Sequence, residues 1–144
     1  MQLLILFVLL TITGLSSACS CIDTSVHEKY CKADFAVLVK VLNNGRVSGM
    51  NRIYRIKLEA TYRSNVYGSV DKRQIFTATN SAACGVILQR GYYYILTGYY
   101  PTIDGARRMK TGLCDIQQRF DRNPKRFYRP PNCNGIYFPN WMST

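Results

Sequence analysis

The segment from Tyr54 to Tyr62 alternates strictly between apolar and polar residues. Its even-numbered positions carry Tyr, Ile, Leu, Ala and Tyr, and its odd-numbered positions carry Arg, Lys, Glu and Thr. Because successive side chains of a strand point to opposite faces, this period of two predicts a strand with one face against a core and the other in solvent.

Three more segments have the β-branched and aromatic composition that strands favour. They are Phe35–Leu42, which stops at the turn signal Asn43-Asn44-Gly45, then Arg73–Thr79 and Tyr92–Tyr99. The chain therefore contains at least four segments that we expect to form strands.

The part of the chain after these strands is less regular. Asp104-Gly105 is a hairpin turn signal, so we expect Ala106–Cys114 to return as a strand. Asp115–Arg122 is expected to form a short helix before Pro124. Together the pattern predicts an all-β fold with minor α content, for which a small antiparallel barrel of the OB type and a β-sandwich are both open.

The first eighteen residues contain no charged side chain, and Leu3–Leu10 is an apolar run. Ser16 and Ala18 place small residues at positions −3 and −1 of a cleavage site, which is typical of a secretory signal peptide. A bacterial lipoprotein signal also ends before a cysteine, but Ser16 stands where such signals prefer leucine. We expect residues 1–18 to be a signal peptide and residues 19–144 to be one secreted, extracellular domain without a membrane span, beginning at Cys19.

All six cysteines lie in the expected mature chain: Cys19, Cys21, Cys31, Cys84, Cys114 and Cys133. An even number in a secreted chain predicts three disulfides, and six cysteines allow 15 pairings. A metal site of its own is disfavoured, because the chain has no Cys-x2-Cys pair and His27 is its only histidine. With every thiol paired and the carboxylates scattered, we expect no enzymatic activity and no cofactor.

The chain carries 19 Lys and Arg against 8 Asp and Glu, a formal net charge of +11. Eight basic residues lie close together and are candidate glycan-binding residues: Arg107, Arg108, Lys110, Arg119, Arg122, Lys125, Arg126 and Arg129. Outside the cell, heparan sulfate and acidic proteins of the extracellular matrix are natural partners of such charge, whereas the secretory signal argues against nucleic acid. The alternative is a solvated basic face without a partner.

The cysteine spacing resembles that of the N-terminal domain of the tissue inhibitors of metalloproteinases (TIMPs), within the netrin-like group. Cys-x-Cys-x9-Cys follows the expected cleavage site, and Cys84-Gly85, Cys114 and Cys133 come in register later. The resemblance extends to Cys133. It implies a five-stranded OB-fold barrel with one or two short helices and the disulfides Cys19–Cys84, Cys21–Cys114 and Cys31–Cys133.

The resemblance also implies inhibition of zinc metalloproteinases of the matrix metalloproteinase type. The backbone amine and carbonyl of Cys19 would bind the catalytic zinc, which the target protease supplies, and displace its water. Ser20 would point toward the S1′ specificity pocket. The implied protease-contacting residues are Cys19, Ser20, Cys21 and Ile22, together with Ala82, Ala83 and Cys84.

The chain departs from the family pattern near this site. Asp23 stands where inhibitors often carry an uncharged residue, and Ala82-Ala83 is smaller than the Ser-Val often found there. We also expect no counterpart of the family's second domain after Cys133. Two hypotheses therefore stand: an inhibitor acting through Cys19, and a non-inhibitory netrin-like module that binds a cell-surface or matrix partner, for immune modulation or glycosaminoglycan binding.

Overall fold

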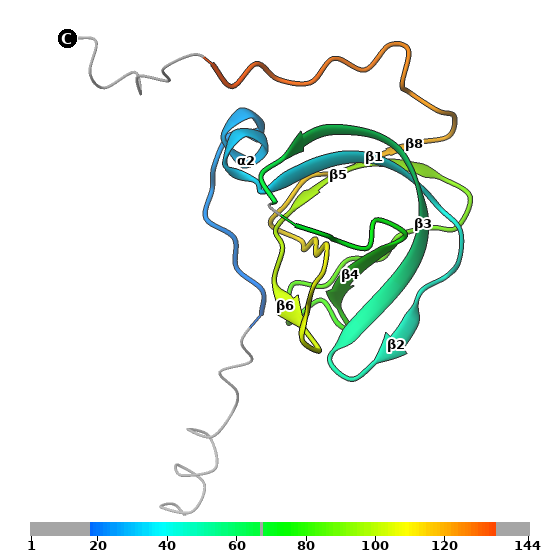
Figure 1. Ribbon diagram of the computed structural model, residues 1–144. Coiled ribbons are helices and arrows are strands. Elements are labelled where there is room, and N and C mark those ends of the chain that lie inside the picture. The colour runs from blue at the N-terminus through cyan, green and yellow to red at the C-terminus, as the bar shows by residue number, and fades with distance from the viewer. Residues whose placement is uncertain (1–17, 67, 135–144) are drawn as a thin grey trace, which may run out of the picture.

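The computed structural model describes residues 18–66 and 68–134. Its main sheet has six strands in the order β2-β3-β1-β5-β8, with β4 paired to β3, and it curls into a half-barrel (Figure 1). The elements are α2 (Val26–Lys32), β1 (Phe35–Val41), β2 (Arg46–Ser48), β3 (Asn51–Ser64), β4 (Gln74–Ala78), β5 (Tyr93–Gly98), β6 (Thr102–Ile103), β7 (Ala106–Arg107) and β8 (Gln117–Phe120). The prediction of a mostly β, OB-type fold with a short helix and three disulfides is confirmed.

The segment 109–111 closes the open side of the curl. Backbone hydrogen bonds of 2.8 and 3.0 Å join it to Phe76 of β4, and two of 3.0 Å join Lys110 to Tyr99 just after β5. This close approach requires Gly98, because a Cβ atom there would lie 2.0 Å from the Lys110 carbonyl oxygen. In the described residues, the main sheet curls and is closed in this way, and the second sheet is only the hairpin β6–β7, so the fold is not a sandwich.

Two sequence predictions about the second half of the chain are wrong. The expected strand Ala106–Cys114 is regular only over Ala106–Arg107, and beyond it Lys110 makes isolated bridges. The expected helix Asp115–Arg122 is instead the strand β8, which pairs antiparallel with β5. An isolated short helix has a costly nucleus, whereas pairing with the free edge of β5 satisfies the backbone groups of both segments.

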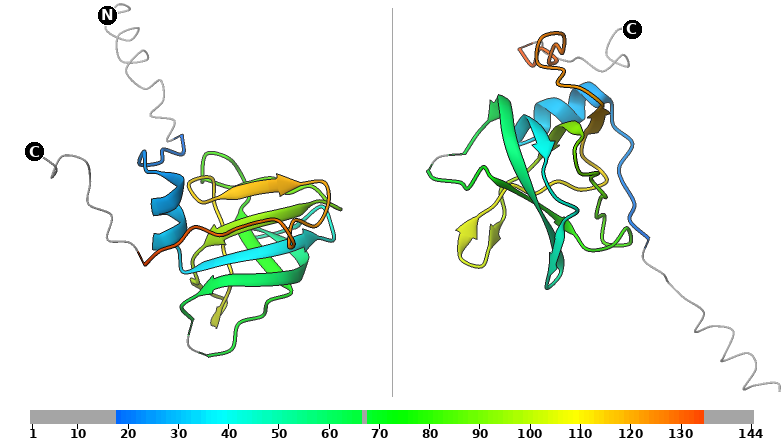
Figure 2. Two further views of the ribbon diagram at one scale, coloured as in Figure 1. Left: turned by 90° about the horizontal axis from the view of Figure 1, so that it is seen from above. Right: turned by 90° about the vertical axis from the view of Figure 1, so that its right-hand side faces the viewer.

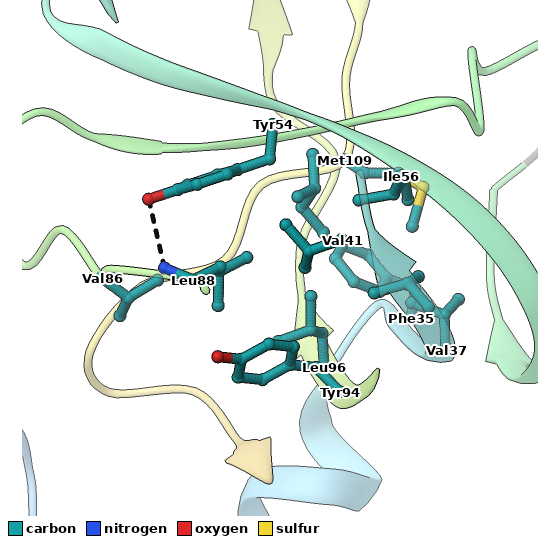
Figure 3. Close-up of a cluster of buried hydrophobic side chains, with 12 residues drawn as sticks. Phe35, Val37, Val41, Tyr54, Ile56, Val86, Leu88, Tyr94, Leu96 and Met109 are labelled. Atoms are coloured by element: carbon teal, nitrogen blue, oxygen red, sulfur yellow. Dashed lines mark hydrogen bonds between the residues drawn. The ribbon is translucent and has the colours of Figure 1, made fainter. Parts of the chain in front are cut away.

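The inward-facing side chains of the strands meet in one apolar core (Figure 3). Its fully buried members include Phe35, Tyr54, Ile75 and Leu96. The even-numbered face predicted for the Tyr54–Tyr62 segment does point inward, with Tyr54 fully buried and Ile56 nearly so.

A loop from residue 85 to residue 90 crosses the inside of the curl and is fastened by core hydroxyl groups. The Tyr54 hydroxyl accepts a hydrogen bond of 3.1 Å from the Leu88 amide (Figure 3). The Thr77 hydroxyl accepts one of 3.0 Å from the Val86 amide, and the Tyr94 hydroxyl one of 3.0 Å from Gln89. Because Val86 and Leu88 are themselves buried, the bonds to Thr77 and Tyr54 satisfy amides that water cannot reach.

The outer face of the central strands is covered as well. Leu38 of β1 and Ile95 of β5 point away from the core yet are fully buried. Helix α2 begins after Ser25, whose side chain accepts a hydrogen bond of 3.1 Å from the Glu28 amide, and it buries Tyr30. The position of this helix was not predicted from the sequence, although Ser25-x-x-Glu28 has the pattern of a capping box.

The C-terminal segment after β8 folds back across the sheet toward α2 (Figure 2). The rings of Tyr128 and Tyr62 lie 5.2 Å apart, and the disulfide Cys31–Cys133 fastens the end of the segment to the helix. The predicted signal peptide, residues 1–18, falls outside the described residues except for Ala18 and stays a prediction. In the described parts of the chain, none of the helices has the length and hydropathy to span a membrane.

Candidate functional site

Three segments far apart in the sequence meet at one edge of the barrel. The disulfide Cys19–Cys84, with a Cα–Cα distance of 5.0 Å, joins the N-terminal segment 19–22 to the turn 81–84. The disulfide Cys21–Cys114, at 5.3 Å, joins the same segment to the turn 112–115. These pairs, with Cys31–Cys133, are the ones that the family resemblance implies. We call the segments 19–22, 81–84 and 112–114 the ridge.

The turn 81–84 is held in a conformation that few residues adopt. Cys84 has φ of 64°, in the left-handed region, and its amide donates a hydrogen bond of 3.0 Å to the Ser81 carbonyl. Gly85 follows, and its amide donates to the Asn80 carbonyl at 2.8 Å. A Cβ atom on Gly85 would lie 2.1 Å from the Ala78 carbonyl oxygen. The positive φ of the disulfide-bonded Cys84 and the close packing of Gly85 against backbone thus fix the conformation of the turn 81–84.

The turn 112–115 supports the ridge from its other side. The Leu113 amide donates a hydrogen bond of 2.8 Å to the Cys84 carbonyl, so the turns are joined directly as well as through disulfides. The Asp115 carboxylate accepts a hydrogen bond of 2.8 Å from the Gly112 amide. Burial raises the pKa of this carboxyl group, while the Gly112 hydrogen bond and the charge of Lys29 oppose the shift.

The predicted contact residues are presented at the surface. Ser20, Cys21, Ala82 and Ala83 are exposed, Ile22 has an exposed fraction of 85%, and the two bonded cysteines Cys19 and Cys84 are half-buried. The ridge is therefore a set of small and apolar groups that are exposed around two disulfides.

Two further residues lie on this surface. Leu113 has an exposed fraction of 48% and was not among the predicted residues. Its apolar character beside Cys114 was the available signal, but only the fold shows that this turn abuts Cys84. Asp23, the departure from the family pattern, is exposed directly after the ridge.

The sulfur atoms of Cys19, Cys84 and Cys114 lie within 4.8 Å of one another. They do not form a thiolate metal site, because each is part of a disulfide. These sulfur atoms are therefore not available as thiolate ligands.

The eight candidate glycan-binding residues fall into two groups. Arg107 lies on the β6–β7 hairpin, the Arg108 guanidinium lies 5.7 Å from the centre of the Phe76 ring, and Lys110 is half-buried in the closing segment. The other five residues are exposed on β8 and the segment that follows it: Arg119, Arg122, Lys125, Arg126 and Arg129. The hairpin and the segment 119–129 are well separated in both views of the fold (Figures 1 and 2).

A curled OB-type sheet whose N-terminal Cys-x-Cys segment is fixed by two disulfides is the architecture of a netrin-like domain. The family model "Tissue inhibitor of metalloproteinase" matches residues 17–124, and the chain belongs to this family.

The curated relatives agree with the family match. The chain is 31% identical over 119 residues to metalloproteinase inhibitor 2 of Homo sapiens, which covers 77% of this chain and 53% of that protein. Over 109 residues it is 31% identical to metalloproteinase inhibitor 2 of Cavia porcellus, and the match covers 70% of this chain and 48% of that protein. Over 137 residues it is 26% identical to tag-225 of Caenorhabditis elegans, and the match covers 88% of this chain and 83% of that protein. The name of tag-225 as a metalloproteinase inhibitor is itself provisional. The chain thus spans about half the length of the mammalian relatives.

Proposed function

We propose that this protein is a secreted inhibitor of zinc metalloproteinases of the matrix metalloproteinase type, and not an enzyme. The observation that carries the proposal is the ridge: Cys19 is bonded to Cys84 while Ser20, Cys21 and the turn 81–83 stay exposed beside it. The membership of the family supports the same class of target.

The chemistry of the ridge centres on the backbone of Cys19. After cleavage behind Ala18, the α-amine and the carbonyl oxygen of Cys19 form a bidentate pair on a segment whose position is fixed. A catalytic zinc keeps one coordination position for water or substrate, which this pair would occupy. An α-amine has a pKa of about 8, so its deprotonation at neutral pH costs little free energy.

The two disulfides explain how a short segment can bind tightly. A free peptide loses conformational entropy when it enters a cleft, but the segment 19–22 is already fixed at Cys19 and Cys21. The exposed side chain of Ser20 would enter the S1′ pocket, and Ala82 and Ala83 would line the opposite side of the cleft.

The decisive experiment changes only the α-amine. A chain that begins at Cys19 is compared with one that carries a single additional alanine before it, by titrating a matrix metalloproteinase and measuring the inhibition constant. Acylation of the amine removes a zinc ligand, so the extended chain should inhibit at least about a hundredfold more weakly, or about 2.7 kcal/mol. Circular dichroism and thermal melting check that the two chains fold alike.

A third chain supplies the matched control. It carries an extension that enteropeptidase removes immediately before Cys19, and inhibition should appear only after cleavage. Equal inhibition by the extended and the processed chains would show that zinc coordination is the wrong mechanism. Absence of inhibition by all processed chains would contradict inhibition itself and leave the hypothesis of a non-inhibitory binding module.

A further inference from the structure

A second exposed surface lies on β8 and the segment that follows it. Five residues line a hollow of about 320 Å³ there: Arg119, Phe120, Asp121, Arg122 and Phe127. We call this hollow the basic groove. Lys125, Arg126 and Arg129 extend its positive charge as exposed residues, and Asp121 is the one acidic residue between 117 and 129.

The groove combines this charge with an exposed aromatic ring. Phe127 has an exposed fraction of 58%, and its ring lies 6.1 Å from that of Phe120 in an edge-on arrangement. The backbone around Phe127 is ordered by its own hydrogen bonds, because the amides of Phe127 and Tyr128 donate to the Pro124 carbonyl at 3.0 and 2.8 Å. Pro124 is buried. This hydrogen-bonded turn therefore keeps the Phe127 ring exposed to solvent.

One of the cations in the groove is fixed as well. The guanidinium of Arg119 lies 4.8 Å from the centre of the Tyr92 ring and donates a hydrogen bond to the Gln89 side chain. A planar guanidinium held in one position recognises a carboxylate by paired hydrogen bonds at a small cost in side-chain entropy. Arg119 is thus a pre-positioned anion-binding group in the same groove as the apolar ring of Phe127.

We propose that the basic groove binds an acidic segment of a partner protein that carries an apolar side chain. The apolar side chain packs on Phe127, and flanking carboxylates pair with Arg119 and Arg122. The charge complementarity excludes a basic or neutral occupant. A sulfated glycan satisfies the cations but has no apolar side chain for Phe127, so the exposed ring favours a peptide over a glycan.

The groove and the ridge are available at the same time. The segment 119–129 lies far from the N-terminal segment at residues 18–22 in both Figure 1 and Figure 2. A protease at the ridge would leave the groove open, so the partner and the protease need not compete.

The test uses two fluorescent twelve-residue peptides made of Asp, Glu and Gly, one with a central Phe and one with Ser in its place. Their binding to the full chain is measured by fluorescence anisotropy at 0.15 M salt, beside that of a labelled heparin oligosaccharide. We expect the Phe peptide to bind about tenfold more tightly than the Ser peptide, because only the first has a partner for Phe127. The variant Phe127→Ser should abolish this difference, and its near-unchanged melting temperature verifies the fold.

Charge variants test whether peptide binding depends on the groove residues or only on the net positive charge of the chain. Arg119→Ser with Arg122→Ser should weaken binding of the Phe peptide about tenfold, whereas Arg107→Ser on the β6–β7 hairpin, the matched exposed control, should leave it unchanged. Equal binding of the two peptides overturns the proposal. So does heparin binding that is tight and insensitive to Phe127→Ser while the peptides do not bind, which identifies a glycan surface instead. Occupation of the groove by residues 135–144 would be revealed if only a chain lacking them bound the Phe peptide, and this too contradicts a free groove.

Discussion

Replacing Tyr54 by phenylalanine should destabilise the protein, whereas the same replacement at Tyr62 should not. The Tyr54 hydroxyl is the hydrogen-bond partner of the buried Leu88 amide at 3.1 Å. Removing it leaves that amide unpaired, which costs about 1–3 kcal/mol. The Tyr62 hydroxyl is buried without a hydrogen-bond partner among the described residues, so Tyr62→Phe removes a desolvated polar group and should be neutral or slightly stabilising.

Urea denaturation followed by circular dichroism, under oxidising conditions, measures both free energies of unfolding. For a domain of this size each kcal/mol corresponds to about 4 °C in melting temperature, so Tyr54→Phe should melt roughly 4–12 °C lower. The slope of the free energy against urea should not change, because both variants expose the same surface on unfolding. If the two variants differ by less than about 0.5 kcal/mol, the loop 85–90 does not depend on the Tyr54 hydroxyl and our account of it is wrong.

Three further predictions concern Ser20 of the ridge, the neighbouring Gly85, and Tyr30. Ser20→Gly should weaken inhibition about fivefold, or about 1 kcal/mol, and Ser20→Arg should separate proteases by S1′ pocket depth; unchanged inhibition constants across a protease panel would place Ser20 outside the cleft. Gly85→Ala forces its Cβ against the Ala78 carbonyl, so it should cost about 1–3 kcal/mol in urea denaturation and also weaken inhibition. Burial, and then the neighbouring Tyr128, raise the pKa of Tyr30 to about 12, so the stability contributed by its neutral phenol should persist to pH 10 and be lost as the pH rises toward 12. Absorbance at 295 nm would contradict this if every tyrosine ionised near pH 10.

The strands were predictable wherever the chain itself alternates or carries β-branched runs. The residues 54–62 lie within β3, and Phe35–Leu42 differs from β1 by one residue, because a half-buried strand leaves its period in the sequence. The sequence of the strand β8 has no such alternation. Three of its four residues, Gln117–Arg119, are polar, and Phe120 alone shows no period; the segment becomes a strand because β5 offers a free edge.

The site was predictable only through the family resemblance. Cysteine count alone leaves the pairing open, and nothing in local composition indicates that residues 19, 84 and 114 meet. Leu113 was missed for the same reason, because its place on the ridge depends on a hydrogen bond to Cys84 from another part of the fold. Closeness in sequence also does not show whether the eight basic residues share a surface, because the closing segment 109–111 and β8 carry them to separate places.

The three disulfides cannot be ranked by their effect on the unfolded chain. Their sequence separations of 65, 93 and 102 residues differ so little that the loop-entropy model separates the shortest from the longest by only about 0.4 kcal/mol. Their difference lies in what they hold in the folded chain. Cys31–Cys133 holds the C-terminal segment against α2, whereas the other two hold the segment 19–22, which supplies the α-amine in the proposed mechanism. If the ridge binds a protease as proposed, loss of either ridge disulfide adds an entropic cost to that binding, besides a loss of stability similar for all three disulfides. Loss of Cys31–Cys133 should lower stability without this added cost.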